Sequence, residues 1–125
     1  EQVFQIASES FTNTHLLTLA KRVSVLAKQA DVDGIVVTHG TDTMELTARA
    51  LGEAIADKTI VLTGAMVPYS VSGSDALFNL GSAVMAAQLV KPGVYIAMNG
   101  RCFPWHSVGK NRAQGVFEGE PLQGA

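Results

Sequence analysis

The sequence predicts a three-layer α/β fold in which helices cover both faces of a parallel sheet, as in Rossmann-like and flavodoxin-like domains. Four short apolar runs alternate with three helical patterns along the chain. The runs also lack the strict polar alternation of strands that face water on one side. Strands of this kind are joined by right-handed crossovers, and ligands bind beyond their carboxyl ends.

The first half of the chain predicts two strands and two helices. An extended-looking run, Gln-Val-Phe-Gln-Ile, begins at residue 2 and predicts a strand near residues 3–7. Residues 12–29 carry apolar side chains in one helical stripe. The run Gly-Ile-Val-Val-Thr at residues 34–38 is rich in β-branched residues, as expected of a buried strand. The alanine-rich residues 43–56 predict the second helix.

The second half repeats the alternation. Thr-Ile-Val-Leu-Thr at residues 59–63 and Gly-Val-Tyr-Ile-Ala-Met at residues 93–98 predict two more buried strands. Between them, residues 74–90 predict the third helix. Its expected apolar stripe consists of Leu77, Leu80, Val84 and Ala87.

Length and composition predict one globular domain. With 47% hydrophobic and 16% charged residues, 125 residues can bury one sizeable core. The net charge of −2 and the lack of a basic cluster do not indicate a nucleic-acid-binding surface. The apolar runs are too short to span a membrane. The single cysteine, Cys102, is interpreted as a core residue rather than a nucleophile. We expect a domain over residues 1–118 and a tail or the start of a linker at residues 119–125.

The most informative segment is Thr-His-Gly-Thr-Asp-Thr-Met-Glu at residues 38–45. Two interpretations stay open from the residues alone. Asp42 and Glu45 match a capping box, with Asp42 as the N-cap of the following helix. The segment also combines the hydroxyl group of Thr41, the carboxylate of Asp42 and free backbone N–H groups, which can serve acyl transfer.

The remaining polar candidates also have alternatives. His39 is a candidate general base, although a structural hydrogen-bonding role is favoured. Lys110 lies in a glycine-adjacent loop and is either a solvated surface residue or a residue held near a hydroxyl group. In the second case, burial would lower its pKa enough to let it accept a proton. His15 and His106 have no partners at metal-ligand spacing, and no glycine-rich phosphate-binding motif follows a predicted strand. We expect no metal and no cofactor.

Three segments together resemble the bacterial-type L-asparaginase/glutaminase family, over essentially the whole chain. The first is the His-Gly-Thr-Asp-Thr core at residues 39–43. The second is Gly-Ala-Met-x-Pro at residues 64–68, followed by Ser-Asp-x-x-Phe-Asn-Leu at residues 74–80. The third is Gly-Val-Tyr-Ile-Ala-Met-Asn at residues 93–99, followed by Lys110.

The resemblance implies a catalytic role for three residues. Thr41 would be the second catalytic threonine, working with Lys110 and Asp42 as a proton-relay triad. Asp42 would also hold the α-ammonium group of the substrate. The family uses no metal or cofactor.

The resemblance also implies three further binding residues. Ser8 and Glu9 match the pair that holds the α-carboxylate and α-ammonium groups of the substrate. Ala65 would offer its backbone carbonyl to the side-chain amide. Because family members are generally oligomeric, a homo-oligomer is expected.

The chain departs from the family pattern in several places. The glycine-rich strand with Thr-Gly-Gly-Thr, which carries the primary nucleophilic threonine, is absent, and so is the tyrosine-bearing loop that closes over the substrate. Val67 stands where many members have arginine. Residues 99–106 and the short tail resemble the small single-domain branch, whereas the first third resembles the two-domain branch. The N-terminus looks incomplete, so we expect these residues alone to be inactive.

The function implied is hydrolysis of the side-chain amide of L-asparagine, with L-glutamine as a second substrate, through a threonine acyl-enzyme. One alternative is an ammonia-releasing amidotransferase subunit, and another is a non-catalytic amino-acid-binding domain of the same fold. A small molecule is the expected partner, without nucleic acid or membrane. The compartment, cytoplasmic or periplasmic, is left open.

Overall fold

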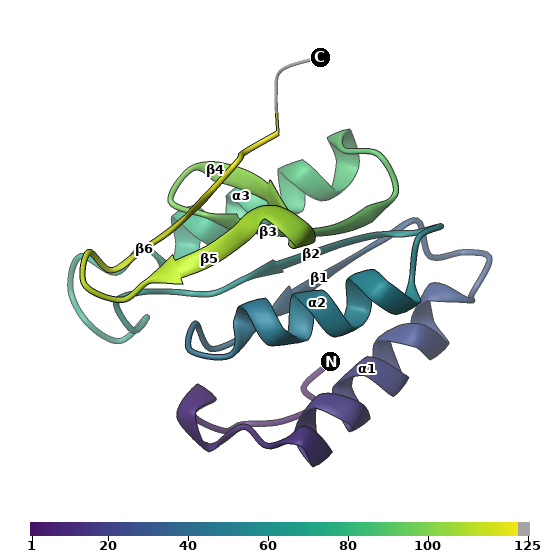
Figure 1. The fold of residues 1–125 in the computed structure, drawn as a ribbon, viewed down its shortest axis with the longest axis horizontal. Helices are drawn as coiled ribbons and strands as arrows, with labels where there is room; N and C mark the ends of the chain where they lie inside the picture. The colour runs from purple at the N-terminus through teal and green to yellow at the C-terminus, as the bar shows by residue number, and fades with distance from the viewer. Residues whose placement is uncertain (123–125) are drawn as a thin grey trace.

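A computed structural model describes residues 1–122, and Figure 1 shows the course of the chain. The expected tail at residues 119–125 is described only in part, because residues 123–125 lie outside the described residues. From the first helix to the third parallel strand, the elements follow the predicted alternation.

The main sheet contains strands in the order β1-β2-β3-β4. β1 (Gly34–Thr38), β2 (Thr59–Thr63) and β3 (Gly93–Met98) are parallel, as predicted. β4 (Arg101–Pro104) was not predicted and runs antiparallel to β3. All residues of β2 are buried, because β2 has a strand on each side and helices above and below.

Helices cover both faces of this sheet (Figure 1). α1 (Asn13–Ala27) and α2 (Met44–Ala54) lie on one face, and α3 (Ala76–Leu89) lies on the other. Alternate side chains of β2 point to opposite faces of the sheet, and each face has its own core. Leu62 packs in the core that α1 and α2 share, and Val61 packs in the core beneath α3. The predicted three-layer α/β architecture is confirmed.

The predicted strand near residues 3–7 is wrong. These residues pair with no strand, and a short 3-10 helix, η1 (Ser8–Ser10), follows them. The ring of Phe4 instead packs edge-on against Phe11 and His15, with centroids 6.2 and 5.0 Å apart. The apolar side chains that suggested a strand are thus used against the start of α1.

Of the stripe predicted for α3, only Ala87 packs against the core beneath the helix, so the inner face is largely different from the one predicted. Its fully buried residues are Asn79 and Ala83, whereas Leu77 and Val84 are 65% and 47% exposed. α3 contains no charged residue and its apolar side chains are spread around the helix, so periodicity could not identify its inner face. The small Ala83 lets the helix lie close to the sheet.

A β-hairpin that the sequence did not predict completes the fold. β5 (Val108–Asn111) and β6 (Val116–Gly119) follow the 3-10 helix η2 (Trp105–Ser107) and lie over the α2 side of the sheet (Figure 1). The Phe117 side chain is 2% exposed and packs in the core on the α2 side of the sheet, which holds the hairpin against the sheet. Lys110 lies opposite Phe117 in this ladder, so the prediction of a loop at Lys110 is wrong.

Cys102, in β4, packs against the core beneath α3. Burial raises the pKa of its thiol to about 11. The thiol is therefore protonated at neutral pH, which agrees with a packing role rather than a nucleophilic one.

Two helical glycines give opposite predictions for the free energy of unfolding. A Cβ at Gly52 would overlap the ring of Trp105, whereas a Cβ at Gly81 would meet nothing within 4 Å. We expect Gly52→Ala to destabilise the protein by about 1–3 kcal/mol through overpacking. Gly81→Ala should stabilise it by roughly 0.5–1 kcal/mol, because alanine favours the helix. Urea unfolding of both variants tests the pair, and equal shifts would contradict it.

Candidate functional site

The site is built at the edge where the parallel strands end. Thr38 pairs with Thr63, so β1 and β2 end side by side. The N–H of His39 donates to the carbonyl of Thr63 over 2.8 Å, which extends the contact into the two following turns. A Cβ at Gly64 would overlap the carbonyl of His39, so this close approach requires glycine.

Lys110 joins the hairpin to the turn after β1. Its Nζ lies 2.9 Å from Thr41 Oγ1 and 2.7 Å from Asp42 Oδ1. The Lys110 side chain is 10% exposed, so the contact is largely shielded from water. The three residues of the predicted relay are therefore in hydrogen-bond contact, although Lys110 is nearly 70 positions from the other two in the sequence.

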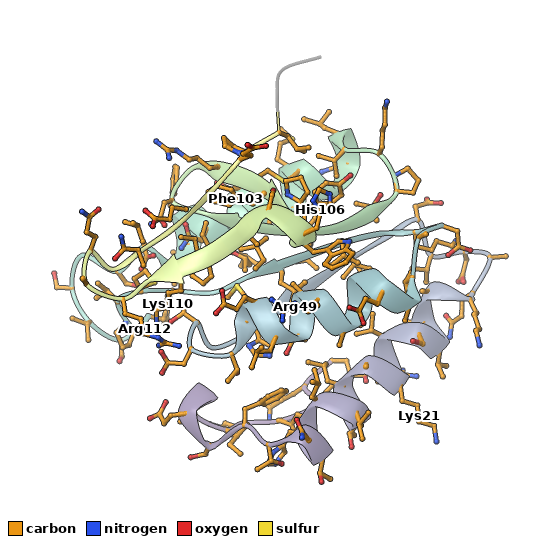
Figure 2. The ribbon with its side chains drawn as sticks, in the orientation of Figure 1. Lys21, Arg49, Phe103, His106, Lys110 and Arg112 are labelled. Carbon is orange, nitrogen blue, oxygen red and sulfur yellow. The ribbon has the colours of Figure 1, made fainter. Side chains whose placement is uncertain are left out.

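Arg112 is a member of this cluster that the sequence analysis missed. Its Nη1 lies 2.7 Å from Asp42 Oδ1, and its Nη2 donates to the Asp42 backbone carbonyl over 3.1 Å. Figure 2 shows Lys110 and Arg112 together at the end of the hairpin. No local pattern signalled this contact, because Arg112 lies in the turn after β5 and the hairpin itself was not predicted.

Asp42 is held as a carboxylate by its two cationic neighbours. The hydrogen bond from Lys110 lowers the pKa of Asp42, and the bond from Arg112 lowers it further. Because the folded pKa is depressed, this carboxylate stays ionised at neutral pH, and its contribution to stability would be lost only as the pH falls through the lowered pKa.

The capping-box interpretation of Asp42 and Glu45 is wrong. The N-cap of α2 is Thr43, and no side-chain bond of Thr43 caps the helix. Asp42 bonds to the hairpin, and Glu45 Oε2 accepts from the backbone N–H of Lys110 over 3.2 Å. Both carboxylates therefore tie α2 to β5 rather than cap α2.

His39 has the surroundings of a structural residue. Its Nδ1 lies 2.7 Å from the carbonyl oxygen of Gly40, and its Nε2 lies 2.9 Å from Thr47 Oγ1. Burial lowers the pKa of His39, which favours the neutral ring. With both ring nitrogens engaged within the protein, the structural role is favoured over that of a general base.

Ala65 lies in the turn after β2, which Asp75 and Asn79 hold. Asp75 accepts from the N–H groups of Met66 and Val67 at 3.1 and 2.9 Å. Burial alone would raise the pKa of Asp75, but these bonds and one from Asn79 leave it below its usual value. The sequence motif around Ser74 and Asp75 thus has a structural explanation.

Asn79 links this turn to the end of β3. Its side-chain N–H group donates to the Gly64 carbonyl over 2.9 Å, and its Oδ1 accepts from the Asn99 N–H over 3.3 Å. Asn79 is fully buried. One side chain therefore connects two of the three turns at the carboxyl edge.

Ser8 and Glu9 lie in η1, at the end of the molecule that carries Lys110 and Arg112 (Figures 1 and 2). Glu9 is exposed, and within residues 1–122 it forms no ion pair with Lys110, whose partners are Thr41 and Asp42. Phe11, just after η1, contacts the ring of His39 with centroids 4.8 Å apart. The segment is thus near the edge of the sheet, without direct contact between Glu9 and the relay residues.

Two cavities meet at residues 38–40. One, of about 630 Å³, lies between β1 and the N-terminal segment. The other, of about 470 Å³, includes Ala65 and Gly64 in its wall. The turns after β1 and β2 therefore both border a cavity.

Neither a metal cluster nor a membrane helix is found in the described part. Among residues 1–122, no group of three or more His, Cys, Asp or Glu side chains could hold a metal ion. No helix in this range is long and apolar enough to cross a membrane.

Comparison with known proteins assigns the chain to a family. A family model described as "Asparaginase, N-terminal" matches residues 1–118. The chain belongs to the asparaginase family. A glutaminase-asparaginase of Pseudomonas aeruginosa is 52% identical over 103 residues, which are 79% of this chain and 28% of that protein.

Solved asparaginase structures share the fold. A probable cytoplasmic L-asparaginase from Campylobacter jejuni superimposes with a TM-score of 0.87 at 36% identity, over 95% of this chain and 40% of the other. The thermostable L-asparaginase from Thermococcus kodakarensis gives 0.86 at 30% identity, over 95% and 37%. The chain thus spans well under half the length of these asparaginases.

Asn79→Leu should destabilise the protein by roughly 1–3 kcal/mol, because it leaves the partly buried Gly64 carbonyl and Asn99 N–H without the buried Asn79 side chain as their partner. Thermal and urea unfolding measure the change. Gln88→Leu, on the exposed side of the same helix, is the control and should change stability by less than about 0.5 kcal/mol. Similar effects of both substitutions would show that the Asn79 network has no special role.

Proposed function

We propose that this chain supplies the proton-relay half of an active site that hydrolyses L-asparagine to L-aspartate and ammonia, with L-glutamine as a second substrate. The observation that carries the proposal is Lys110 Nζ, which lies 2.9 Å from Thr41 Oγ1 and 2.7 Å from Asp42 Oδ1. A module that only binds an amino acid does not need an ammonium group on a threonine hydroxyl. The similarity to a glutaminase-asparaginase and to L-asparaginases supports the same reaction.

In the proposed reaction, a threonine outside this chain attacks the side-chain amide carbon and forms an acyl-enzyme. The proton that the attacking hydroxyl group loses enters the relay of Thr41 and Lys110, and the relay delivers one proton to the departing nitrogen as the C–N bond breaks, so that ammonia leaves. Water then attacks the ester, and a proton returns to the threonine along the same route. The Asp42 carboxylate stabilises the positive charge of Lys110 whenever Lys110 carries the proton.

Substrate binding is proposed at the groups that surround this relay. Asp42 would hold the α-ammonium group, and the carbonyl of Ala65 would accept a hydrogen bond from the side-chain amide. Ser8 and Glu9 would contact the α-carboxylate and α-ammonium groups once the substrate bridges the gap between η1 and Asp42. The cavity wall at Ala65 supports this arrangement.

The nucleophile is proposed on a strand that pairs with the outer edge of β1. Among the described residues, β1 pairs only with β2, and the cavity of about 630 Å³ follows its other side. A parallel strand added there would end near Thr41 at the carboxyl edge. We also propose that the domain ends at residue 118 and that the complete protein is a homo-oligomer.

Thr41→Ala in the complete protein should lower kcat for L-asparagine by roughly two to four orders of magnitude, because the relay loses its hydroxyl group. Folding should be almost unchanged, since Thr41 is not the N-cap of α2. Ammonia release and thermal unfolding are the measurements. Thr18→Ala, on α1, is the control and should leave kcat unchanged. Wild-type turnover by Thr41→Ala would show that the contact is structural.

The 125-residue chain alone should release no ammonia from L-asparagine, because a relay without its nucleophile has no covalent route. A version extended upstream to include a Thr-Gly-Gly-Thr strand should regain turnover. Both are assayed for ammonia under the same conditions. If the short chain is active and Thr41→Ala abolishes that activity, Thr41 itself is the nucleophile and the proposed division of the site is wrong.

A further inference from the structure

We propose that Arg112 occupies, before substrate binds, the place on Asp42 that the α-ammonium group of the substrate takes, and that substrate binding displaces it. The inference rests on the proposed function, in which Asp42 binds that ammonium group. Arg112 would thus compete with the α-ammonium group of the substrate for Asp42.

The first support is the crowding of cations at one oxygen. Lys110 Nζ and Arg112 Nη1 each lie 2.7 Å from Asp42 Oδ1. The nearby Glu45 carboxylate accepts from the backbone N–H of Lys110 and not from either of these cationic groups, so Asp42 alone holds both. A substrate ammonium group would be a third cation at a carboxylate that already has two. Mutual repulsion then favours the departure of one of them.

The second support is the difference in burial between the two cations. The Arg112 side chain is 60% exposed, whereas that of Lys110 is 10% exposed. Arg112 can therefore turn into water with its charge hydrated, and an exposed ion pair of this kind is weak. Lys110 is also bonded to Thr41 and is held by the hairpin. The cation that leaves is Arg112.

The third support is the geometry of the Arg112 guanidinium. One nitrogen donates to the Asp42 carboxylate and the other to the Asp42 backbone carbonyl. Arg112 thus holds both the side chain and the backbone of Asp42. When the substrate arrives, its ammonium group can replace the bond to the carboxylate and restore the same number of cations at Asp42.

The test compares Arg112→Gln, Arg112→Lys and wild type in the complete protein. Because an exposed ion pair is weak, Arg112→Gln should lower the KM for L-asparagine about two- to five-fold, with kcat changed less than about two-fold. Arg112→Lys keeps a cation and should return KM towards the wild-type value. The inhibition constant of succinamate, which has the amide and carboxylate but no α-ammonium group, should be the same in all three. Arg49→Gln, on the exposed surface of α2, is the control (Figure 2).

Two kinds of result overturn the proposal. If Arg112→Gln raises KM, leaves it unchanged, or shifts succinamate as much as L-asparagine, Arg112 does not compete with the ammonium group, although the proposed function stands. If the complete wild-type protein does not hydrolyse L-asparagine, or Asp42→Asn leaves KM unchanged, the proposed function fails, and the inference fails with it.

Discussion

The ammonium group of Lys110 is the least exposed cation in the polar contacts that connect the hairpin to the turn after β1. It reaches from β5 to the turn between β1 and α2, where it meets a hydroxyl group and a carboxylate. The hairpin itself is docked by Phe117 in the core on the α2 side of the sheet. Apolar packing therefore brings Lys110 to the edge of the sheet, and the polar cluster forms because the core is already in place.

The layered architecture could be predicted from the sequence because buried parallel strands have a distinct composition. β1, β2 and β3 lie where their β-branched runs predicted them. The N-terminal segment shows the limit of this reasoning. Its composition suits a strand, but a strand also needs a hydrogen-bonded neighbour, and the packing of Phe4 against α1 gives this segment another use. α3 shows a second limit, since a helix whose apolar side chains are spread around it has no periodicity from which to infer its inner face.

The candidate site was predicted in part. The contact of Thr41 and Asp42 with Lys110 agrees with the resemblance, whereas the residues alone left a capping role for Asp42 open. Tertiary structure decided between them, because the partners of Asp42 come from a hairpin that no local pattern indicated. Arg112 was missed for the same reason. The catalytic roles of these residues, together with those of Ser8, Glu9 and Ala65, stay predictions.

The long sequence separation within the polar cluster also bears on how the molecule folds and opens. Residues 41 and 42 are far from residues 110 and 112 along the chain, so their contacts close a large loop and must form late. The β5–β6 ladder is short and lies outside the main sheet. Fluctuations that detach this hairpin would separate the cluster while the parallel sheet remains intact, so that amide protons of β5 would exchange with solvent faster than those of β2.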